Sequence, residues 1–381
     1  MNQDTKRNKK QVNVLIIQRI LTHYRIPFFQ KLSQSPMLNI TCAYGKEHPQ
    51  SSLKSIFNPS GIMTKELYNL FIGPRERITY QKGLLSLINS RNYQVIIAEF
   101  GPSIISNIIA LFYAKKLGIK FIWWGHGIKP LSSKLNIKLR IWLANQADAI
   151  IFYAPEQAEM FINWGFTEKK VFIAPNSIDV EKIIPLAKIG DFENRNRILY
   201  IGRLIPEKKI DILIHGFAQA WKRLKPETRL TIIGDGPERN KLERLAQTAG
   251  IFDKVEFTGG IYDMEQLAPW FNSALVSVSP GCVGLSAIHS LAFGLPMIVA
   301  RNEPHGPEVS SLQENINCLF FPSDDTKILS EMLIYLFDNK KQWEKMAGAA
   351  SMTISERYNL IAMVIAFEQA VNYVLSFRHI F

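Results

Sequence analysis

The chain has 381 residues, a formal net charge of +12, 47% hydrophobic residues and 20% charged residues. This length predicts more than one domain, and we expect two, since domains average roughly 100–200 residues. The composition is that of an ordinary globular protein and argues against a low-complexity or collagen-like chain. The three cysteines (Cys42, Cys282 and Cys318) are far apart and lack CxxC spacing, which argues against a disulfide framework or a structural zinc site.

The positive charge lies in the first half of the chain. Residues 1–185 hold 24 lysines and arginines against 11 acidic residues, whereas the remainder holds 21 against 22. Such a basic half is expected to meet an anionic partner, either a membrane surface, a phosphorylated acceptor or nucleic acid. A generically basic surface is the alternative. Because no nucleic-acid-binding module is recognisable, we do not expect nucleic acid as a partner.

In chain order, the first ten residues are polar and basic, and no apolar h-region follows them. We therefore expect no secretory signal and a cytoplasmic location. Apolar runs of strand length then alternate with helical patterns in both halves of the chain. The expected strands are residues 13–18, 38–44, 94–100, 120–125, 149–153 and 171–174, then 197–202, 229–234, 255–259, 275–279 and 297–300, with helices such as 208–222 and 237–247 between them.

Continuous apolar strands separated by helices indicate parallel sheets covered on both faces, so each half is predicted to be a doubly wound α/β domain. The periodicity fades between residues 175 and 196, where proline, glycine and charge gather. We predict an N-terminal domain over residues 1–185 and a second domain over residues 186–354. Ligands of such sheets bind at the carboxyl ends of the strands, so two domains facing across a cleft would place the chemistry there.

The C-terminal segment, residues 355–381, is mostly helical in pattern and rich in apolar residues. Glu368, Gln369 and Asn372 interrupt its most apolar stretch, so it is not predicted to span a membrane. We expect it to pack back across the domains. A helix lying on a membrane surface is the alternative, although its polar positions form no strongly basic face.

Two strand-to-helix turns indicate a phosphate site. Residues 276–296 predict a buried strand, a turn through Gly284 and a helix start, where free backbone N–H groups and the helix dipole favour an anion. About eighty residues earlier, the strand in residues 198–208 runs into Gly202 and Arg203, with Lys208 five positions on. Together these turns predict one site for a nucleotide diphosphate.

Five segments of the second half stand in an order and spacing that resemble the donor domain of glycosyltransferase family 4. They are GRLIPEKKIDILIHGFA, LTIIGDGPERNKLERLA, VEFTGG, VGLSAIHSLAFGLPMIVA and NCLFFPSDD, and the resemblance covers roughly residues 149–325. PNSID at residues 175–179 is similar to the family's linker motif, and WGHG at residues 124–127 to its His-Gly turn. The resemblance implies a GT-B fold, with two Rossmann-like domains facing across a cleft, and metal-independent sugar transfer from a nucleotide sugar with retained configuration.

The resemblance also implies roles for individual residues. Arg203 and Lys208 would stabilise the departing diphosphate, as a guanidinium and an ammonium can do without a metal. The alternative is that they are surface residues of a first helical turn. GDG at residues 234–236 is interpreted as a structural turn. The predicted donor-binding residues are Gly202, the nucleobase turn Gly259, Gly260 and Ile261, and the diphosphate turn Gly284, Leu285 and Ser286, although Gly284 could serve only a tight turn.

His126 follows a predicted strand, where the family places a histidine near the reacting carbon of the donor sugar. We expect it to contact the sugar or to act in catalysis, though not as the base; a structural histidine is the alternative. The chain departs from the family at two other positions. The usual pair of glutamates, eight positions apart, falls on Gly281 and His289. His289 can still bond ribose hydroxyls, but Gly281 has no side chain to hold the sugar.

Two further groups are candidates. Glu308, which follows His305 in the next loop, is either a donor-binding residue or a carboxylate at a helix N-terminus. In the basic half, four residues just after the first strand are predicted to bind an acidic or pyrophosphate-linked acceptor; the alternative is that their neighbours are core and their charges solvated. These four are Arg19, His23, Tyr24 and Arg25.

The sequence thus predicts a cytoplasmic hexosyltransferase that binds peripherally to the inner face of the membrane. It would extend a lipid-linked or surface glycan, as in polysaccharide, capsule or lipopolysaccharide biosynthesis, and would need no cofactor besides the nucleotide-sugar co-substrate. Two alternatives stay open. One is a nucleotide-sugar epimerase or hydrolase on the same scaffold, and the other is a non-catalytic nucleotide-sugar-binding protein, which the missing glutamates favour.

Overall fold

The computed structural model describes residues 11–51, 53–73, 77–90, 92–128 and 133–376. The predicted absence of a secretory signal concerns residues 1–10, which lie outside this range. The chain divides into two compact units, one of residues 1–175 with 360–381 and the other of residues 176–359. The predicted boundaries were residues 185 and 355.

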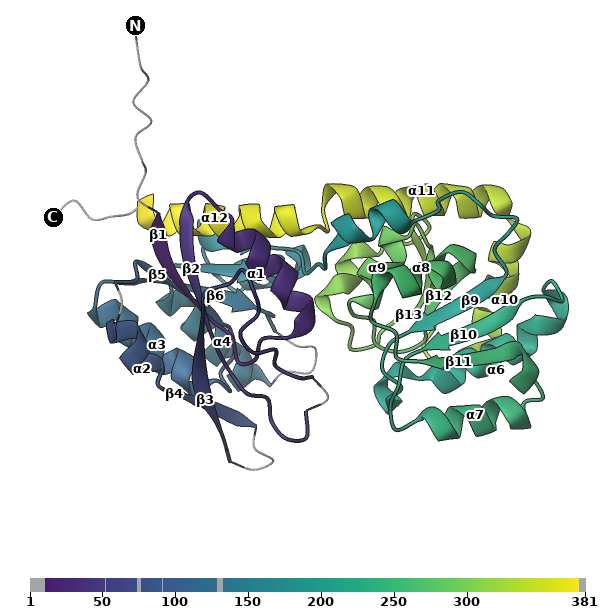
Figure 1. Ribbon diagram of the computed structural model, residues 1–381, viewed down its shortest axis with the longest axis horizontal. Coiled ribbons are helices and arrows are strands. Elements are labelled where there is room, and N and C mark those ends of the chain that lie inside the picture. Colours follow the sequence, from purple (N-terminus) through teal and green to yellow (C-terminus); the bar gives the residue numbers. More distant parts are fainter. Residues whose placement is uncertain (1–10, 52, 74–76, 91, 129–132, 377–381) are drawn as a thin grey trace, which may run out of the picture. The chain divides into compact units, whose positions relative to one another are not determined.

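The first unit is built on an eight-stranded sheet in the order β4-β3-β2-β1-β5-β6-β7-β8 (Figure 1). All neighbours pair in parallel except β3 and β4, which form an antiparallel hairpin at the edge. The strands are β1 (Val12–Ile17), β2 (Leu38–Gly45), β3 (Thr64–Ile72), β4 (Ile78–Lys82), β5 (Val95–Glu99), β6 (Lys120–Gly125), β7 (Ala149–Phe152) and β8 (Val171–Ile173).

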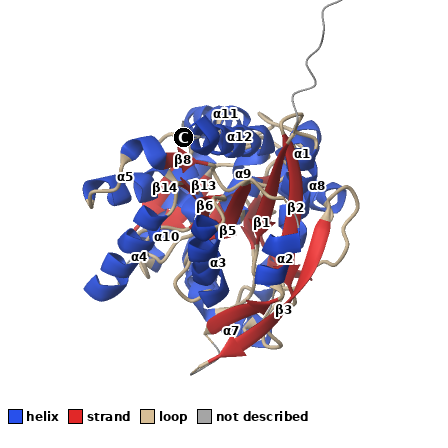
Figure 2. Cartoon of the chain, turned by 90° about the vertical axis from the view of Figure 1, so that its left-hand side faces the viewer, coloured by secondary structure: helices blue, strands red, loops and turns tan. Residues whose placement is uncertain are grey.

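Helices cover both faces of this sheet (Figure 2). Val14 and Ile16 of β1 point into the core beneath α1 and α12, whereas Leu15 and Ile17 point into the core beneath α2, α3, α4 and α5. This burial on both sides explains why the central strands are continuously apolar. The helices are α1 (Ile26–Ser33), α2 (Leu84–Ser90), α3 (Ile105–Lys116), α4 (Lys134–Gln146), α5 (Pro155–Asn163) and α12 (Leu360–Ser376).

The second unit holds a six-stranded, wholly parallel sheet in the order β11-β10-β9-β12-β13-β14. Its strands are β9 (Arg197–Ile201), β10 (Arg229–Ile233), β11 (Val255–Gly259), β12 (Ala274–Ser279), β13 (Met297–Ala300) and β14 (Cys318–Phe321). Its helices are α6 (Ile210–Ala220), α7 (Arg239–Thr248), α8 (Met264–Ser273), α9 (Ser286–Ala292), α10 (Thr326–Asp338) and α11 (Lys340–Glu356).

The predicted α/β class is confirmed in each unit. Every predicted strand is present, with ends that differ by no more than one residue from those expected. The sequence-based prediction missed three strands, the hairpin β3–β4 and the edge strand β14. The polar residues Lys65, Glu66 and Asn69 interrupt the apolar pattern of β3.

The C-terminal helix packs on the first unit. Met363, Phe367 and Val371 of α12 are buried in the core with residues of α1 and β6, and the Phe367 ring contacts the rings of Phe28 and Trp124 at 4.9 Å. Within the described residues, 340–376 is the single helical stretch with the length and apolar composition to cross a membrane. It is interrupted at residues 357–359, between α11 and α12. Burial in the core accounts for most of the apolar residues of α12, although Ile361 and Ile365 are exposed.

Candidate functional site

The sheet of the second unit has a topological switch point between β9 and β12. From β9 the chain proceeds outward through β10 to β11, and from β12 it proceeds the other way through β13 to β14. Doubly wound sheets bind their ligands at such a switch point, beside the carboxyl ends of the strands. Both predicted diphosphate turns lie at this point: Gly202 to Lys208 follows β9, and Pro280 to Ser286 follows β12.

The two loops are bonded to each other. Lys208 Nζ donates to the carbonyl oxygen of Cys282 at 2.5 Å, and the Cys282 N–H donates to the carbonyl oxygen of Glu207 at 3.1 Å. The backbone of Glu207 and Lys208 passes very close to Gly281. A Cβ on Gly281 would clash with the Glu207 carbonyl oxygen and lie 2.8 Å from the Lys208 carbonyl carbon. Glycine at 281 thus has a steric cause, since the loops could not meet with a side chain between them.

The ammonium of Lys208 differs from that of Lys209 in its hydrogen-bond partners. Lys209, at a left-handed φ of 50°, starts α6 and bonds Glu303 Oε1 at 2.7 Å and Asp324 Oδ1 at 2.9 Å, which raises the pKa of its ammonium. Lys208, by contrast, bonds a neutral carbonyl, and no described carboxylate lies within ion-pair distance of it. The Lys208 ammonium at the switch point is therefore not paired with a described carboxylate, whereas that of Lys209 is. Arg203 is exposed on the same loop, where its carbonyl oxygen accepts from Tyr200 Oη at 3.0 Å.

His305 fixes the other side of the loop after β12. The Val283 N–H donates to His305 Nδ1 at 3.1 Å, so Nε2 carries the ring proton and donates to the Ala300 carbonyl oxygen at 3.0 Å. The neighbouring Gly306 N–H donates to the Val283 carbonyl oxygen at 2.8 Å. Burial lowers the pKa of His305, which favours this neutral form. The sequence-based prediction placed His305 in this loop but gave it no role.

The predicted diphosphate turn leads into α9. Gly284 accepts from the Ala287 N–H at 2.9 Å, and a Cβ on Gly284 would meet nothing within 4 Å, so the space beside it is open. The first N–H groups of a helix have no partner inside the helix, and Ser286 is the first residue of α9. His289, one turn later, is half-buried, with Nδ1 lying 3.0 Å from the Leu285 carbonyl oxygen.

The predicted nucleobase turn follows β11. Gly259 has φ of 79°, and the Gly260 N–H donates to Asp235 Oδ2 at 3.1 Å; Ile261 comes next and is half-buried. Asp235 is held in turn by Arg239 Nη1 at 3.2 Å. The sequence-based prediction missed both side chains. The signal in the sequence was Asp235, an acidic residue inside the GDG turn, whose side chain reaches the end of the neighbouring strand β11.

The GDG turn itself requires its glycines. A Cβ on Gly234 would clash with the carbonyl oxygen of Gly202, and one on Gly236 with that of Leu204. Both backbones come together at the end of β9, next to the Arg203 loop. The turn therefore packs the loops after β9 and β10 against each other, in line with the structural role predicted for it.

Glu308 is buried in the first turn of a short 3-10 helix, Pro307–Ser311. Asn176 Nδ2, from the PNSID segment, donates to Glu308 Oε1. The other carboxylate oxygen of Glu308, Oε2, lies so close to Gly306 that a Cβ on Gly306 would clash with it. Glu308 thus joins the PNSID segment to the loop that also carries His305. Its role in donor binding stays a prediction, beside the alternative of a carboxylate at a helix N-terminus.

In the first unit, His126 lies at the carboxyl end of β6 and is exposed. Its ring is 4.9 Å from that of Tyr153, which follows β7. Arg140 of α4 donates from Nη1 to the Gly127 carbonyl oxygen at 3.0 Å, and burial lowers the pKa of its guanidinium. Gly127 packs tightly, since a Cβ would lie 3.2 Å from Phe161. The turn that carries His126 is therefore held from α4 and α5.

Arg25 joins the same cluster. It is 7% exposed, its Nη2 donates to Tyr153 Oη at 2.9 Å, and its guanidinium lies 5.0 Å from the ring centres of both Trp124 and Tyr153. Its Nη1 is buried and has no hydrogen-bond partner among the described residues. A buried cation among aromatic rings whose Nη1 has no hydrogen-bond partner is suited to an anionic group.

The other predicted acceptor residues are exposed or half-buried. Arg19 is exposed, and its backbone N–H donates to Glu99 Oε2 at 3.1 Å, across the switch point between β1 and β5. His23 is exposed, and its ring contacts that of the half-buried Tyr24 in an edge-on geometry at 5.6 Å. Partial desolvation lowers the pKa of His23. All four residues thus follow β1; His23 contacts Tyr24, Tyr24 lies beside Arg25, and Arg25 bonds Tyr153.

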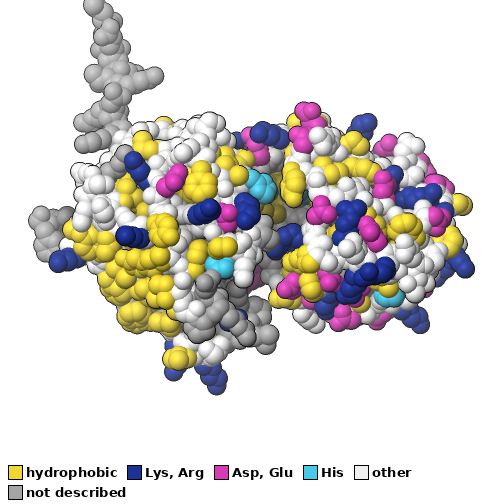
Figure 3. All heavy atoms as spheres, turned by 60° about the horizontal axis from the view of Figure 1, so that its bottom comes forward, with side chains coloured by type: hydrophobic (Ala, Val, Ile, Leu, Met, Phe, Trp, Pro, Cys, Tyr) yellow, Lys and Arg dark blue, Asp and Glu magenta, His cyan; other side chains and the backbone are white. Residues whose placement is uncertain are grey.

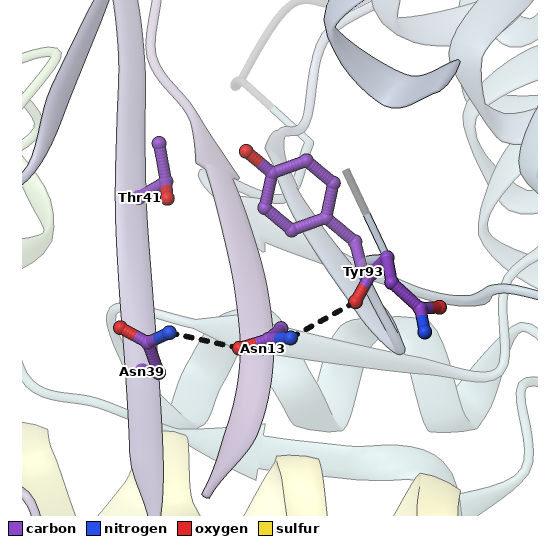
Figure 4. A pocket seen from close by; sticks show the side chains of 5 residues that line it. Asn13, Asn39, Thr41 and Tyr93 are labelled. Atoms are coloured by element: carbon purple, nitrogen blue, oxygen red, sulfur yellow. Dashed lines mark hydrogen bonds between the residues drawn. The ribbon is translucent and has the colours of Figure 1, made fainter. Parts of the chain in front are cut away.

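A small pocket in the first unit lies elsewhere. Asn13, Asn39, Thr41, Asn92 and Tyr93 line it (Figure 4), and Asn39 Nδ2 donates to Asn13 Oδ1 at 2.8 Å. Asn13 and Asn39 stand near the amino ends of β1 and β2. Because doubly wound sheets bind ligands at the carboxyl ends, this pocket is not the predicted site. Among the described residues, no group of three or more histidine, cysteine or acidic side chains is placed to hold a metal ion.

Known proteins resemble the chain in both halves. The family model "Glycosyltransferase Family 4" matches residues 45–182, and the model "Glycosyl transferases group 1" matches residues 185–352. Mannosylfructose-phosphate synthase of Agrobacterium fabrum is 24% identical over 56% of this chain and 50% of its own length. Alpha-monoglucosyldiacylglycerol synthase of Streptococcus pneumoniae is 34% identical over 30% of this chain and 26% of its own length. The alignments thus span half or less of these two relatives.

Solved structures resemble the fold over nearly the whole chain. The Anabaena protein HepE in complex with UDP has a TM-score of 0.71 at 14% identity and covers 95% of this chain and 100% of its own. A glycosyltransferase from Rickettsia africae has a TM-score of 0.73 at 13% identity, covering 97% of this chain and 100% of its own. These likenesses confirm the GT-B fold. With the two family models side by side along the sequence, this chain belongs to the glycosyltransferases that join a family 4 domain to a group 1 domain.

Proposed function

We propose that this protein transfers a hexose from a nucleoside-diphosphate sugar to a lipid-linked or surface-glycan acceptor, with retention of configuration. The observation that carries the proposal is the bond between Lys208 Nζ and the Cys282 carbonyl. It holds an ammonium that is not paired with a carboxylate at the switch point, beside the open space at Gly284. A diphosphate bound there would meet the cations Lys208 and Arg203 and the N–H groups of Gly284, Leu285 and Ser286.

The chemistry follows from these charges. The bond between the sugar's anomeric carbon and the β-phosphate oxygen breaks, the acceptor hydroxyl oxygen bonds to that carbon on the same face, and the hydroxyl proton passes to the departing phosphate. Negative charge develops on the diphosphate as it leaves, and Arg203 and Lys208 stabilise it in place of a metal ion. Gly202, Gly259, Gly260 and Ile261 would lie along the nucleoside, with His289 and Glu308 near the ribose.

The first unit would supply the acceptor side. Arg25, whose buried Nη1 has no hydrogen-bond partner among the described residues, is suited to the phosphate of a lipid-linked acceptor, which Arg19, His23 and Tyr24 would also bind. His126 would contact the donor sugar. The excess of cations in residues 1–185 supports peripheral binding to the anionic inner face of the cell membrane.

A thermal-shift screen with UDP, GDP, ADP and their sugars tests donor binding, since a ligand of the folded state raises its melting temperature. The nucleotide found is then used in transfer assays with and without a polyprenyl-linked acceptor, with the anomeric configuration of the product read by NMR. Release of nucleotide that depends on the acceptor, and persists with EDTA, is expected. Release without an acceptor would instead favour the hydrolase.

A non-catalytic nucleotide-sugar-binding protein is the second candidate, because Gly281 and His289 replace the family's two carboxylates. It predicts binding of the nucleotide sugar without turnover. Equal rates of product formation in the wild type and in the Arg203→Ala and Lys208→Ala variants would favour it.

A further inference from the structure

Helix α3 exposes an apolar stripe to solvent. Ile105, Ile109 and Phe112 are all exposed, and their spacing of four and three residues places them on one face of the helix. The opposite face, with Ala110 and Leu111, is buried in the core. A surface helix normally turns polar residues outward, so this outer stripe needs another explanation.

Helix α4 repeats the pattern. Leu135, Leu139 and Trp142 have the same spacing, and Leu135 and Trp142 are 79% and 49% exposed. Leu143 and Ala144 supply its buried side. The two neighbouring helices thus both carry an outer apolar stripe over two turns.

The two stripes form one surface. The rings of Phe112 and Trp142 lie 5.9 Å apart, and Lys115 Nζ of α3 donates to Gln146 Oε1 of α4 at 3.0 Å. Hydrophobic side chains gather over a broad area of the first unit in Figure 3. We call the six apolar side chains, with the cations around them, the α3–α4 face. A connected apolar area of this kind marks an interaction site.

The charge of the α3–α4 face identifies its partner. Within residues 105–116 and 134–146 the sequence has no aspartate or glutamate. The exposed cations of the two helices are Lys115, Lys116, Lys134 and Lys138, whereas Arg140 is half-buried and bonds the Gly127 carbonyl oxygen. Lysine stems can lie along apolar surface while their ammonium groups reach the phosphate layer, and tryptophan favours the same depth. Exposed apolar side chains and exposed lysines on the same two helices match an anionic lipid surface.

We propose that the α3–α4 face docks on an anionic lipid bilayer, with its six apolar side chains entering the boundary between headgroups and acyl chains. The inference rests on the proposed function in one respect, since a lipid-linked acceptor would be met at that surface. It goes further in naming which part of the basic half makes the contact. It also distinguishes α3 and α4 from α12, whose apolar residues are largely buried in the core.

The test is co-sedimentation of the full chain with phosphatidylcholine vesicles, with or without phosphatidylglycerol. The wild type should pellet with the anionic vesicles only, and less at high salt. Replacing Leu139 and Trp142 by serine should weaken vesicle binding at least about tenfold, because both lose their apolar surface. Lys138→Gln should weaken it about fivefold. Ile361→Ser with Ile365→Ser on α12 is the matched control, since both residues are exposed and one turn apart, and its binding should equal that of the wild type.

Unchanged binding of the Leu139→Ser/Trp142→Ser variant would overturn the proposal, as would loss of binding in the α12 control or equal binding to neutral vesicles. If the wild type instead forms dimers that this variant abolishes, and binds no vesicles, the face is an interface between copies of the chain. Vesicle binding needs neither donor nor acceptor. A protein that binds vesicles but transfers no sugar would therefore refute the proposed function and leave the docking surface standing.

Discussion

Lys208 and Cys282, 74 residues apart in the chain, meet in a 2.5 Å bond between an ammonium and a backbone carbonyl. The bond crosses the switch point of the second sheet and joins the loops that leave β9 and β12. A carbonyl orients the ammonium but leaves its charge unneutralised. Lys209, one residue on, is bonded to two carboxylates and cannot take the same role.

Replacing Lys208 by alanine is expected to lower kcat by about 10²–10³, because the departing diphosphate loses a preorganised cation. Steady-state transfer kinetics measure this change. Lys241→Ala is a matched control in the same unit, since Lys241 forms an exposed ion pair with Glu238 at 2.7 Å. That pair should contribute little to stability and nothing to turnover. A Lys208→Ala enzyme as fast as the Lys241→Ala enzyme would contradict the role given to Lys208.

The sequence was sufficient to locate the two loops, because continuous apolar strands and turn glycines are local signals. It could not show that Lys208 reaches Cys282, or that Asp235 holds the Gly260 N–H, since such contacts depend on the order of strands in the sheet. The sequence likewise showed that Gly281 stands where the family has a carboxylate, but it did not show why. The close approach of the Glu207 backbone is visible only in the fold.

Gly281→Ala is expected to lower the free energy of unfolding by about 1–3 kcal/mol, because the added Cβ clashes with the backbone of Glu207 and Lys208. Gly281→Glu should not restore the family's carboxylate, since the same clash displaces the loop before any sugar can be held. Urea unfolding and the thermal shift with the donor nucleotide measure both effects.

Gly284→Ala is the control for that clash. A Cβ on Gly284 meets nothing within 4 Å, and its φ is not positive, so the variant should unfold at the same urea concentration as the wild type. Equal stability of the Gly281→Ala variant would show that the two loops are farther apart than in this structure.

The bonds of His305 predict a pH dependence. Its folded pKa is lowered below the ordinary 6.5 by burial, so the folded state holds the neutral ring. The neutral ring's contribution to folding stability is complete above the unfolded pKa of about 6.5. It is lost as the pH falls from there through the folded pKa, because the unfolded chain then binds a proton that the folded chain does not. Glu303 opposes this shift by favouring the charged ring, and Lys208 adds to it. Once protonated, Nδ1 can no longer accept from the Val283 N–H.

Nucleotide affinity should therefore fall more steeply with acidification in the wild type than in a His305→Asn variant, which has no group that titrates there. Titrations at about pH 7.5 and pH 5.5 test this, and the variant corrects for protonation of the nucleotide itself. His23→Gln is the control, because the pKa of His23 is also lowered but the residue lies in the first unit. Parallel pH profiles in the wild type and His305→Asn would show that the ring does not control the loop.

The Tyr153→Phe variant tests whether the first unit acts in acceptor binding and not in donor binding. The change removes the hydroxyl that accepts from Arg25 Nη2, so a buried guanidinium loses a bond, at an expected cost of about 1–3 kcal/mol in the free energy of unfolding. If Arg25 binds the acceptor's anionic group, its displacement should raise KM for the acceptor and leave the thermal shift with the donor nucleotide unchanged, since most of the proposed donor-binding residues lie in the second unit. Tyr113→Phe on α3 is the control, because its hydroxyl bonds Asn89 at the surface. A Tyr153→Phe enzyme with unchanged acceptor KM but weaker nucleotide binding would place Arg25 outside the acceptor site.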